Sequence, residues 1–230
     1  MHLYEQLQRD TAADREFLIG APVIQGALAG QISRGLYVDF LTQAYHHVRH
    51  TVPLLMAVGA RLPERHEWLR EAVLHYLEEE AGHEQWILND IENAGGDRAS
   101  AATSQPALAT ECMVAYAYDT VARRNPLGFF GMVYVLEGTS VALALHAADR
   151  IQSTLGLPSN AFSYLRSHGE LDQEHVGDLE SILGRLTEAE DREAVVRCAK
   201  GVFWLYGNLF RGLETDVAAK RAAAPARLRA

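Results

Sequence analysis

Two short stretches of the sequence place metal-ligand residue types at helical spacing. In "HGELDQEH", His168, Asp172 and His175 follow one another at steps of four and three residues. Because a helix advances about 100° per residue, these side chains fall within an arc of roughly 60° and can converge on one point. Two imidazoles and a carboxylate suit a divalent metal such as iron and leave coordination positions open. A solvent-exposed charged face would show the same pattern, so this stretch alone does not decide between the two.

The second stretch, "EEEAGHE", contains a pair of the same form. Glu80 and His83 repeat the carboxylate-x-x-His spacing of Asp172 and His175, and Glu79 is an alternative to Glu80. Helical bundles that hold two iron ions use this arrangement, with two such pairs on two helices and one Glu from each of two others. The sequence therefore predicts two half-sites that folding must bring together.

A single acid in an apolar run supplies the next candidate. Glu137 is the only charged residue of "GFFGMVYVLEGTSVALAL". An ionised carboxylate is costly to bury unless it is paired or binds a metal, so we expect Glu137 to join the site. Glu80 and Glu137 are accordingly the predicted catalytic carboxylates. A capping or salt-bridging Glu within the core is the alternative, and Gly138 would allow another helix to approach closely.

The fourth helix of such a bundle should carry a Glu, but the candidate segment reads "YHHVRH". His47 or His46 could replace the missing carboxylate, because imidazole also suits iron. A histidine that merely lines the cavity and forms hydrogen bonds is the alternative. Aromatic residues near these stretches are candidates for the wall of a substrate cavity or for plain core: Tyr45, Trp86, Phe130, Tyr134, Trp204 and Tyr206.

Helical periodicity dominates the chain, and no run of alternating β-branched residues is bounded by turns. The sequence therefore predicts an all-α bundle of seven to eight helices around a central cavity. Pro53 should kink or split the second long helix, and residues 95–106 should form the main exposed loop. We expect helices at 3–19, 36–60, 63 or 66–94, 107–124, 127–152 and 188–218, a short segment at 23–29, and a further helix that contains "HGELDQEH" and ends near residue 184.

Composition and charge limit the partners. The formal net charge of −9 argues against nucleic acid, because binding phosphate requires a clustered basic face. We expect one domain over residues 1–218 and a basic tail over 219–230. The N-terminus lacks the features of a signal peptide, and no run of eighteen apolar residues predicts a membrane span. With two cysteines, Cys112 and Cys198, the chain is expected to be cytoplasmic with reduced thiols.

These residues carry a family resemblance. The sequence resembles the TenA/THI-4/PqqC-like superfamily, which has the haem-oxygenase-like helical fold, and within it the branch of haem-oxygenase-like di-iron oxidases and oxygenases. The signature of that branch is an early Glu, a Glu near a His on the next helix, a later Glu and a His-x3-Asp-x2-His helix. The similarity spans about Leu36 to Glu180 and places on this signature His83, Glu137, His168, Asp172 and His175. Histidine stands where the early Glu belongs.

The resemblance implies a non-haem iron enzyme with two iron ions, or with manganese as the alternative metal, that uses O2 to oxidise a small organic substrate. It implies that His83 and His175 bind iron, that Glu137 bridges two ions, and that Asp172 and His168 complete the second. Two other functions stay open: a TenA-like, thiaminase II-type hydrolase of thiamin-related pyrimidines with a cysteine nucleophile, and an inactive metal- or ligand-binding relative. The amphipathic outer helices predict a homodimer.

Overall fold

The structure is a computed structural model. It describes the backbone of residues 2–223 and, within that range, all side chains except those of residues 170–175 and 214–223.

Helices account for all the regular structure of the described residues, which confirms the predicted all-α class. They outnumber the seven to eight that the sequence predicts, because several predicted helices are each divided in two. The α-helices are α1 Leu3–Asp10, α2 Ala12–Ile19, α3 Pro22–Leu28, α4 Arg34–Val48, α5 Thr51–Arg61, α6 Leu69–Glu80, α7 His83–Asn93, α8 Arg98–Thr103, α9 Leu108–Arg123, α10 Phe129–Leu155, α11 Ser163–Gly184 and α12 Ala189–Ala223. Three single turns of 3-10 helix connect them: η1 Glu64–His66, η2 Pro126–Gly128 and η3 Ser159–Ala161.

Two of the divisions have local causes that the sequence did not reveal. Thr11 separates α1 from α2, with φ −113° and ψ 11°, and its hydroxyl donates to the Leu7 carbonyl at 2.7 Å. The chain between α4 and α5 turns at Arg49 and His50 rather than at Pro53. Pro53 is the third residue of α5, where a backbone N–H would have no partner within the helix, so the ring is accommodated without a kink.

The division between α6 and α7 bears directly on the predicted site. Gly82 has a φ of 95°, a left-handed conformation that glycine adopts at little cost, and it ends the helix that the sequence predicts to continue to residue 94. Glu80 is consequently the last residue of α6 and His83 the first of α7. Beyond α7, the predicted loop contains the short helix α8, which begins where the Asp97 carboxylate accepts a hydrogen bond from the Ser100 amide at 3.0 Å.

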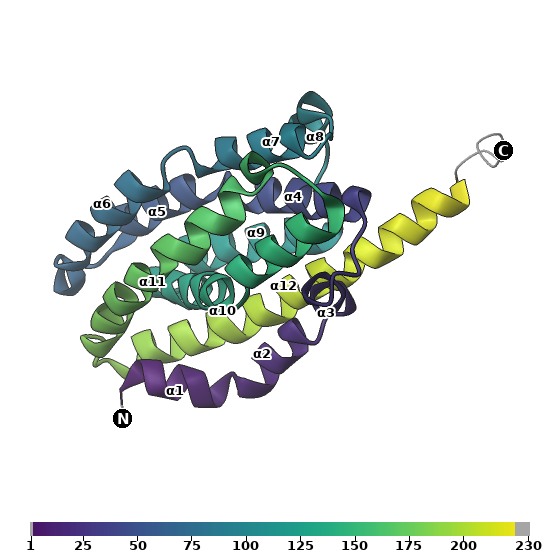
Figure 1. Cartoon of the computed structure of the whole chain (residues 1–230). Helices are drawn as coiled ribbons and strands as arrows, with labels where there is room; N and C mark the ends of the chain where they lie inside the picture. Colours follow the sequence, from purple (N-terminus) through teal and green to yellow (C-terminus); the bar gives the residue numbers. More distant parts are fainter. Residues whose placement is uncertain (1, 224–230) are drawn as a thin grey trace, which may run out of the picture.

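Helix α10 lies at the centre of the bundle between α11 and α12, while α6 and α7 cover one side and α1 and α2 the other (Figure 1). Small residues let these helices approach closely. A Cβ on Gly131 would lie 2.8 Å from the Ala199 amide nitrogen of α12, and one on Gly169 would lie 2.7 Å from Leu145 of α10. At Gly138, where the sequence suggested a close approach, a Cβ would meet no atom within 4 Å among the described residues.

The segment Pro126–Leu155, which contains α10, is long and apolar enough to cross a membrane by length and composition. Its most apolar window is 61% buried inside the protein, as in the core helix of a bundle. The division into a domain of residues 1–218 and a basic tail remains a prediction: α12 continues to Ala223, and residues 224–230 lie outside the described part of the chain.

Candidate metal centre

Three predicted ligands come together in the fold. One carboxylate oxygen of Glu80 and one ring nitrogen each of His83 and His168 lie within 4.8 Å of one another. Glu80 ends α6, His83 begins α7 and His168 lies on α11, so the turn at Gly82 lets two consecutive helices present their ends to a third. Two imidazoles and a carboxylate that converge while leaving room for further ligands form the arrangement typical of non-haem iron oxygenases.

Neighbouring groups orient both imidazoles. Nδ1 of His168 lies 3.0 Å from the Tyr164 carbonyl oxygen; since a carbonyl only accepts, Nδ1 is the donor and the lone pair of the neutral ring is on Nε2. Nδ1 of His83 lies 3.0 Å from Oε2 of Glu80. The His83 ring also stacks on Trp86, with ring centroids 4.1 Å apart and 29° between the planes. The two imidazoles are therefore held edge to face, with centroids 4.9 Å apart.

A buried acid that the sequence did not suggest as functional connects the two histidine helices. Asp90 of α7 is fully buried and accepts hydrogen bonds from the amides of Ser163 and Tyr164, at 2.9 and 2.8 Å, at the start of α11. Burial raises its pKa, although the two backbone hydrogen bonds oppose that shift. Nothing in the spacing of Asp90 distinguishes it from a surface acid, because its partners lie on a distant segment.

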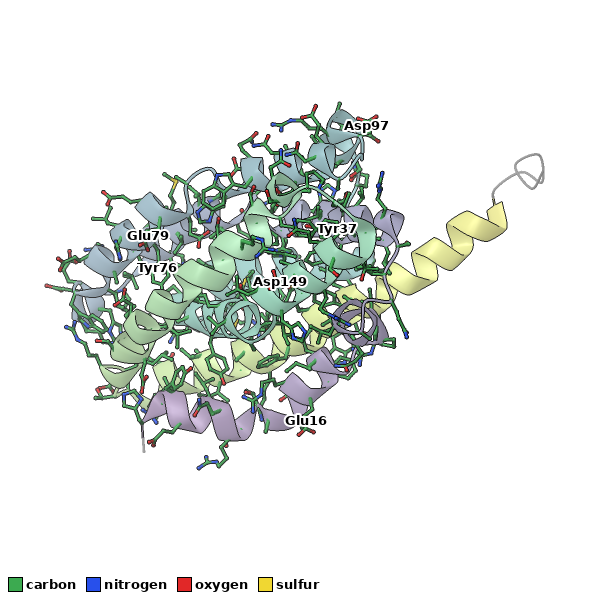
Figure 2. All side chains as sticks on the ribbon, viewed as in Figure 1. Glu16, Tyr37, Tyr76, Glu79, Asp97 and Asp149 are labelled. Atoms are coloured by element: carbon green, nitrogen blue, oxygen red, sulfur yellow. The ribbon has the colours of Figure 1, made fainter. Side chains whose placement is uncertain are left out.

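The metal-ligand residues open onto a cavity of about 160 Å³. Glu80, Glu137 and His168 all line it, and Glu137 is only 7% exposed. Tyr76 lines it from α6, where Figure 2 also labels Glu79. Burial and the nearby charge of Glu137 raise the pKa of Tyr76, so its hydroxyl stays protonated and can donate a hydrogen bond. Glu137 thus shares a cavity with two of the three clustered ligands.

The structure separates the two histidines between which the sequence could not choose. His47 lines the cavity and is 3% exposed, and its Nε2 has no hydrogen-bond partner among the described residues. Burial, followed by the charge of His168, lowers the pKa of His47 to about 3, so the ring is neutral at physiological pH. His46 does not line the cavity; its Nε2 lies 2.8 Å from the Ser104 hydroxyl. His47 is therefore the one of the pair that can serve as a ligand.

The other acid alternative is separated in the same way. Glu80 lies at the cluster with its side chain 11% exposed, whereas Glu79 points toward His75, with Oε1 3.4 Å from Nε2 of that residue. Asp172 and His175 follow His168 on α11 by one and two turns, but their side chains lie outside the described residues. Among the described residues, the structure thus joins Glu80 and His83 of one predicted half-site to His168 of the other, whereas the resemblance assigned His168 to the second ion.

Most of the predicted cavity aromatics lie elsewhere. Tyr206 lines the cavity, but the other five do not. Tyr134 packs in the core against Tyr4 and Phe203, with ring centroids 5.6 and 6.2 Å apart. Trp86 stacks on His83, and Trp204 is 59% exposed. Phe130 and Tyr45 are buried away from the cavity. Helical spacing identifies aromatic residues but not the face each one occupies.

Solved structures support the fold. The chain is similar to a domain of unknown function with a haem-oxygenase-like fold from Shewanella denitrificans, with 26% identity, a TM-score of 0.86 and 97% of each chain covered. A TenA homologue from P. horikoshii has 10% identity, a TM-score of 0.76 and coverage of 93% of this chain and 98% of its own. A haem oxygenase from the cyanobacterium Synechocystis has 14% identity, a TM-score of 0.73 and coverage of 96% of each chain. The latter two likenesses concern the fold alone.

Sequence comparison identifies the family. No curated protein sequence is significantly similar to this chain. The sequence profile of the iron-containing redox enzymes, however, matches residues 38–207, a span that begins in α4, contains the cluster of Glu80, His83 and His168, and ends in α12. This protein therefore belongs to the iron-containing redox enzyme family.

Proposed function

We propose that the protein is a non-haem iron oxidase or oxygenase that uses O2 to oxidise a small organic substrate. The convergence of Glu80, His83 and His168 beside a buried cavity carries the proposal. One carboxylate and two imidazoles are a donor set that binds Fe(II) and leaves positions for O2 and substrate. The family description is consistent with this choice of metal, and manganese remains an alternative that metal analysis distinguishes.

If two ions bind, Glu80, His83 and His168 would hold one of them, and Glu137, Asp172 and His175 would supply ligands to the other. The neutral imidazole of His47 would be a further ligand at the cavity wall. Iron, when bound, supplies the electrons that reduce O2. The chain orients the imidazoles through Tyr164 and Trp86, and the buried wall keeps water from the reacting groups.

A TenA-like hydrolase is the second function to consider, and it requires a nucleophile. Neither cysteine lines the cavity in the described structure. Cys198 is buried on α12, where burial raises the pKa of its thiol to about 12, and Cys112 is exposed. A thiol with so high a pKa is almost entirely protonated at neutral pH and is a poor nucleophile. The geometry therefore favours the iron enzyme over the cysteine hydrolase. Binding of iron and its reaction with O2 would distinguish the iron enzyme from an inactive relative.

The test is metal content and O2 uptake of the full-length protein loaded anaerobically with Fe(II). We expect the wild type to retain iron after desalting and to consume O2 when mixed with oxygenated buffer. His83→Ala and His168→Ala should lose iron and O2 uptake, and Glu80→Gln should bind iron more weakly. His146→Ala, at an exposed position of α10, is the matched control and should behave as wild type. Unchanged iron stoichiometry in both histidine variants would refute the proposed site.

A further inference from the structure

The wall of the cavity indicates what kind of molecule the site accepts. We propose that the substrate is a small amphiphile: an uncharged hydrocarbon body fills an apolar arm of the cavity, and its one polar group reaches the carboxylates and imidazoles at the metal centre. The reaction that follows rests on the proposed function, but the binding does not require metal. The arm is formed by the second half of the α10 lining together with α3 and the facing side chains of α12.

Helix α10 shows how the wall changes from polar to apolar. Glu137, Thr139 and Ser140 line the cavity near its middle, and the residues that continue the same face of the helix are Leu143, Ala144, Ala147 and Ile151. At 1.5 Å per residue, the stretch from Glu137 to Ile151 extends the wall by about 20 Å along the helix axis. Apolar residues also line the cavity on the N-terminal side, namely Phe129, Met132, Val133 and Leu136. The polar groups of α10 therefore form a short band, and the lining toward the C-terminal end of the helix is hydrocarbon.

Helices α4 and α12 make the same transition on the opposite wall. The ring of Tyr206 lies against His47 of α4, with centroids 5.8 Å apart, and against Phe210, with centroids 4.8 Å apart. Phe210 in turn stacks on Phe40, with centroids 5.7 Å apart. An aromatic wall therefore leads from the metal end into the arm. Helix α3 closes the arm with aliphatic side chains, namely Val23, Ile24, Ala27 and Leu28.

Charge determines which molecules the arm excludes. Among the described residues that line the cavity there is no Lys or Arg, and the acids Glu80 and Glu137 both belong to the metal end. An ionised group placed in the arm would lose its hydration without gaining a partner, which is unfavourable. Substrates with a second charged group at the far end, such as free diacids or phosphorylated metabolites, are therefore excluded.

Volume limits the hydrocarbon body. The cavity of about 160 Å³ is similar in size to the dry engineered cavity of ~150 Å³ that binds benzene. The cavity as a whole therefore accommodates a molecule on the order of six carbon atoms, of which the arm takes the hydrocarbon part. Longer chains would have to displace side chains of the wall, so affinity should stop rising with chain length once the arm is full.

The experiment is titration calorimetry of the metal-free, full-length protein with straight-chain primary alcohols from 1-butanol to 1-decanol. Their uncharged heads avoid repulsion by the two carboxylates. We expect each added methylene to tighten binding roughly fourfold until the arm is full, followed by a plateau. Ala147→Phe should move the plateau to shorter alcohols, and Ile151→Ala should move it to longer ones. Ala142→Phe, on the same helix but exposed, is the control that should leave the series unchanged.

A further alcohol tests the charge argument: 6-hydroxyhexanoate, whose carboxylate meets either the two acids or the apolar arm, should bind at least tenfold more weakly than 1-hexanol. The inference is overturned if affinity does not depend on chain length, if 6-hydroxyhexanoate binds as well as 1-hexanol, or if the Ala147 and Ala142 variants behave alike while thermal unfolding shows both folded. Failure of the proposed function looks different: alcohols bind with the expected length dependence, but Fe(II) does not bind. Iron binding without alcohol binding would leave the proposed function intact and remove the substrate assignment.

Discussion

At the scale of single residues, the orientation of His83 depends on a neighbour one turn along α7. The Trp86 indole stacks on the imidazole on one side, and the Glu80 carboxylate contacts Nδ1 at the ring edge. A ring held on two sides loses little rotational freedom when it binds metal, because the protein has already restricted it. Groups of this kind, which touch a ligand but not the metal, commonly change metal affinity by 10–100-fold.

We therefore expect Trp86→Ala to weaken Fe(II) binding about tenfold, while Trp86→Phe, which keeps a flat ring, largely restores it. Trp204→Ala is the matched control, because Trp204 is 59% exposed on α12 and does not contact the cluster. Competitive titration of Fe(II) against a chromophoric chelator measures all three affinities. Equal affinity in the wild type and Trp86→Ala would show that the stacking does not position the imidazole.

The sequence indicated which residue types could bind metal, but it did not indicate which side of each helix faces the cavity. Glu80, His83 and His168 were recognisable because two separate segments each pair a carboxylate with an imidazole at steps of three or four residues. Whether His46 or His47 faces the cavity could not be predicted, since both are buried and the two positions differ only by about 100° around α4. That choice depends on how α4 rotates against α7, α8 and α12, which no local pattern records.

At the scale of helices, Asp90 sets the position of one ligand helix relative to the other. It lies two turns after His83 on α7, and the amides it caps begin α11 one turn before His168. A carboxylate at a helix N-terminus satisfies amides that have no partner within the helix and interacts favourably with the helix dipole. Here the cap comes from another helix, so it fixes both the start of α11 and its distance from α7.

Asp90→Ala should therefore lower stability by about 1–2 kcal/mol and weaken Fe(II) binding as well. Asp97→Ala is the control: Asp97 caps α8 through the Ser100 amide, and α8 carries none of the clustered ligands. Figure 2 labels Asp97 near α8, at the edge of the molecule. The control should lose stability without losing affinity. Urea unfolding and chelator competition separate the two effects, and equal affinity losses in both variants would argue against a positioning role.

The helix boundaries show where prediction from sequence stops. A proline breaks a helix only in its interior. Pro53 lies in the first turn of α5, where its missing N–H removes no hydrogen bond of the helix. Gly82 does interrupt a helix, yet single glycines occur inside many helices, and only its φ of 95° reveals the turn. The class, the long core helix and the ligand types could be predicted, whereas the turn that directs Glu80 and His83 toward His168 could not.

At the scale of the whole molecule, one buried carboxylate joins three distant segments. Asp191 is fully buried in the first turn of α12 and accepts a hydrogen bond from the side-chain amide Nδ2 of Asn125 at 2.6 Å. It also lies 2.6 Å from Nε2 of His66 and forms an ion pair with Arg65 at 3.2 Å. Burial alone would raise its pKa, but the hydrogen bonds from Asn125 and His66 and the charge of Arg65 together hold the pKa below its usual value of 3.8. The folded state thus favours the ionised form.

This pKa direction fixes the sign of a pH dependence. A lowered pKa in the folded state means that the ionised Asp191 stabilises the protein at pH values above about 4, and that this contribution disappears as the pH falls through the folded pKa. Asp191→Asn should therefore be less stable than wild type by about 1–3 kcal/mol at pH 7, with a difference that shrinks below pH ~4. Asp149→Asn is the control: it breaks the ion pair with Arg166, in which the Asp149 side chain is 66% exposed. This substitution should lower the free energy of unfolding by under ~1 kcal/mol. Urea unfolding from pH 7 to pH 3 measures both variants. A difference that stays constant to pH 3 would mean that Asp191 stabilises the bundle through its shape and hydrogen bonds rather than through its charge.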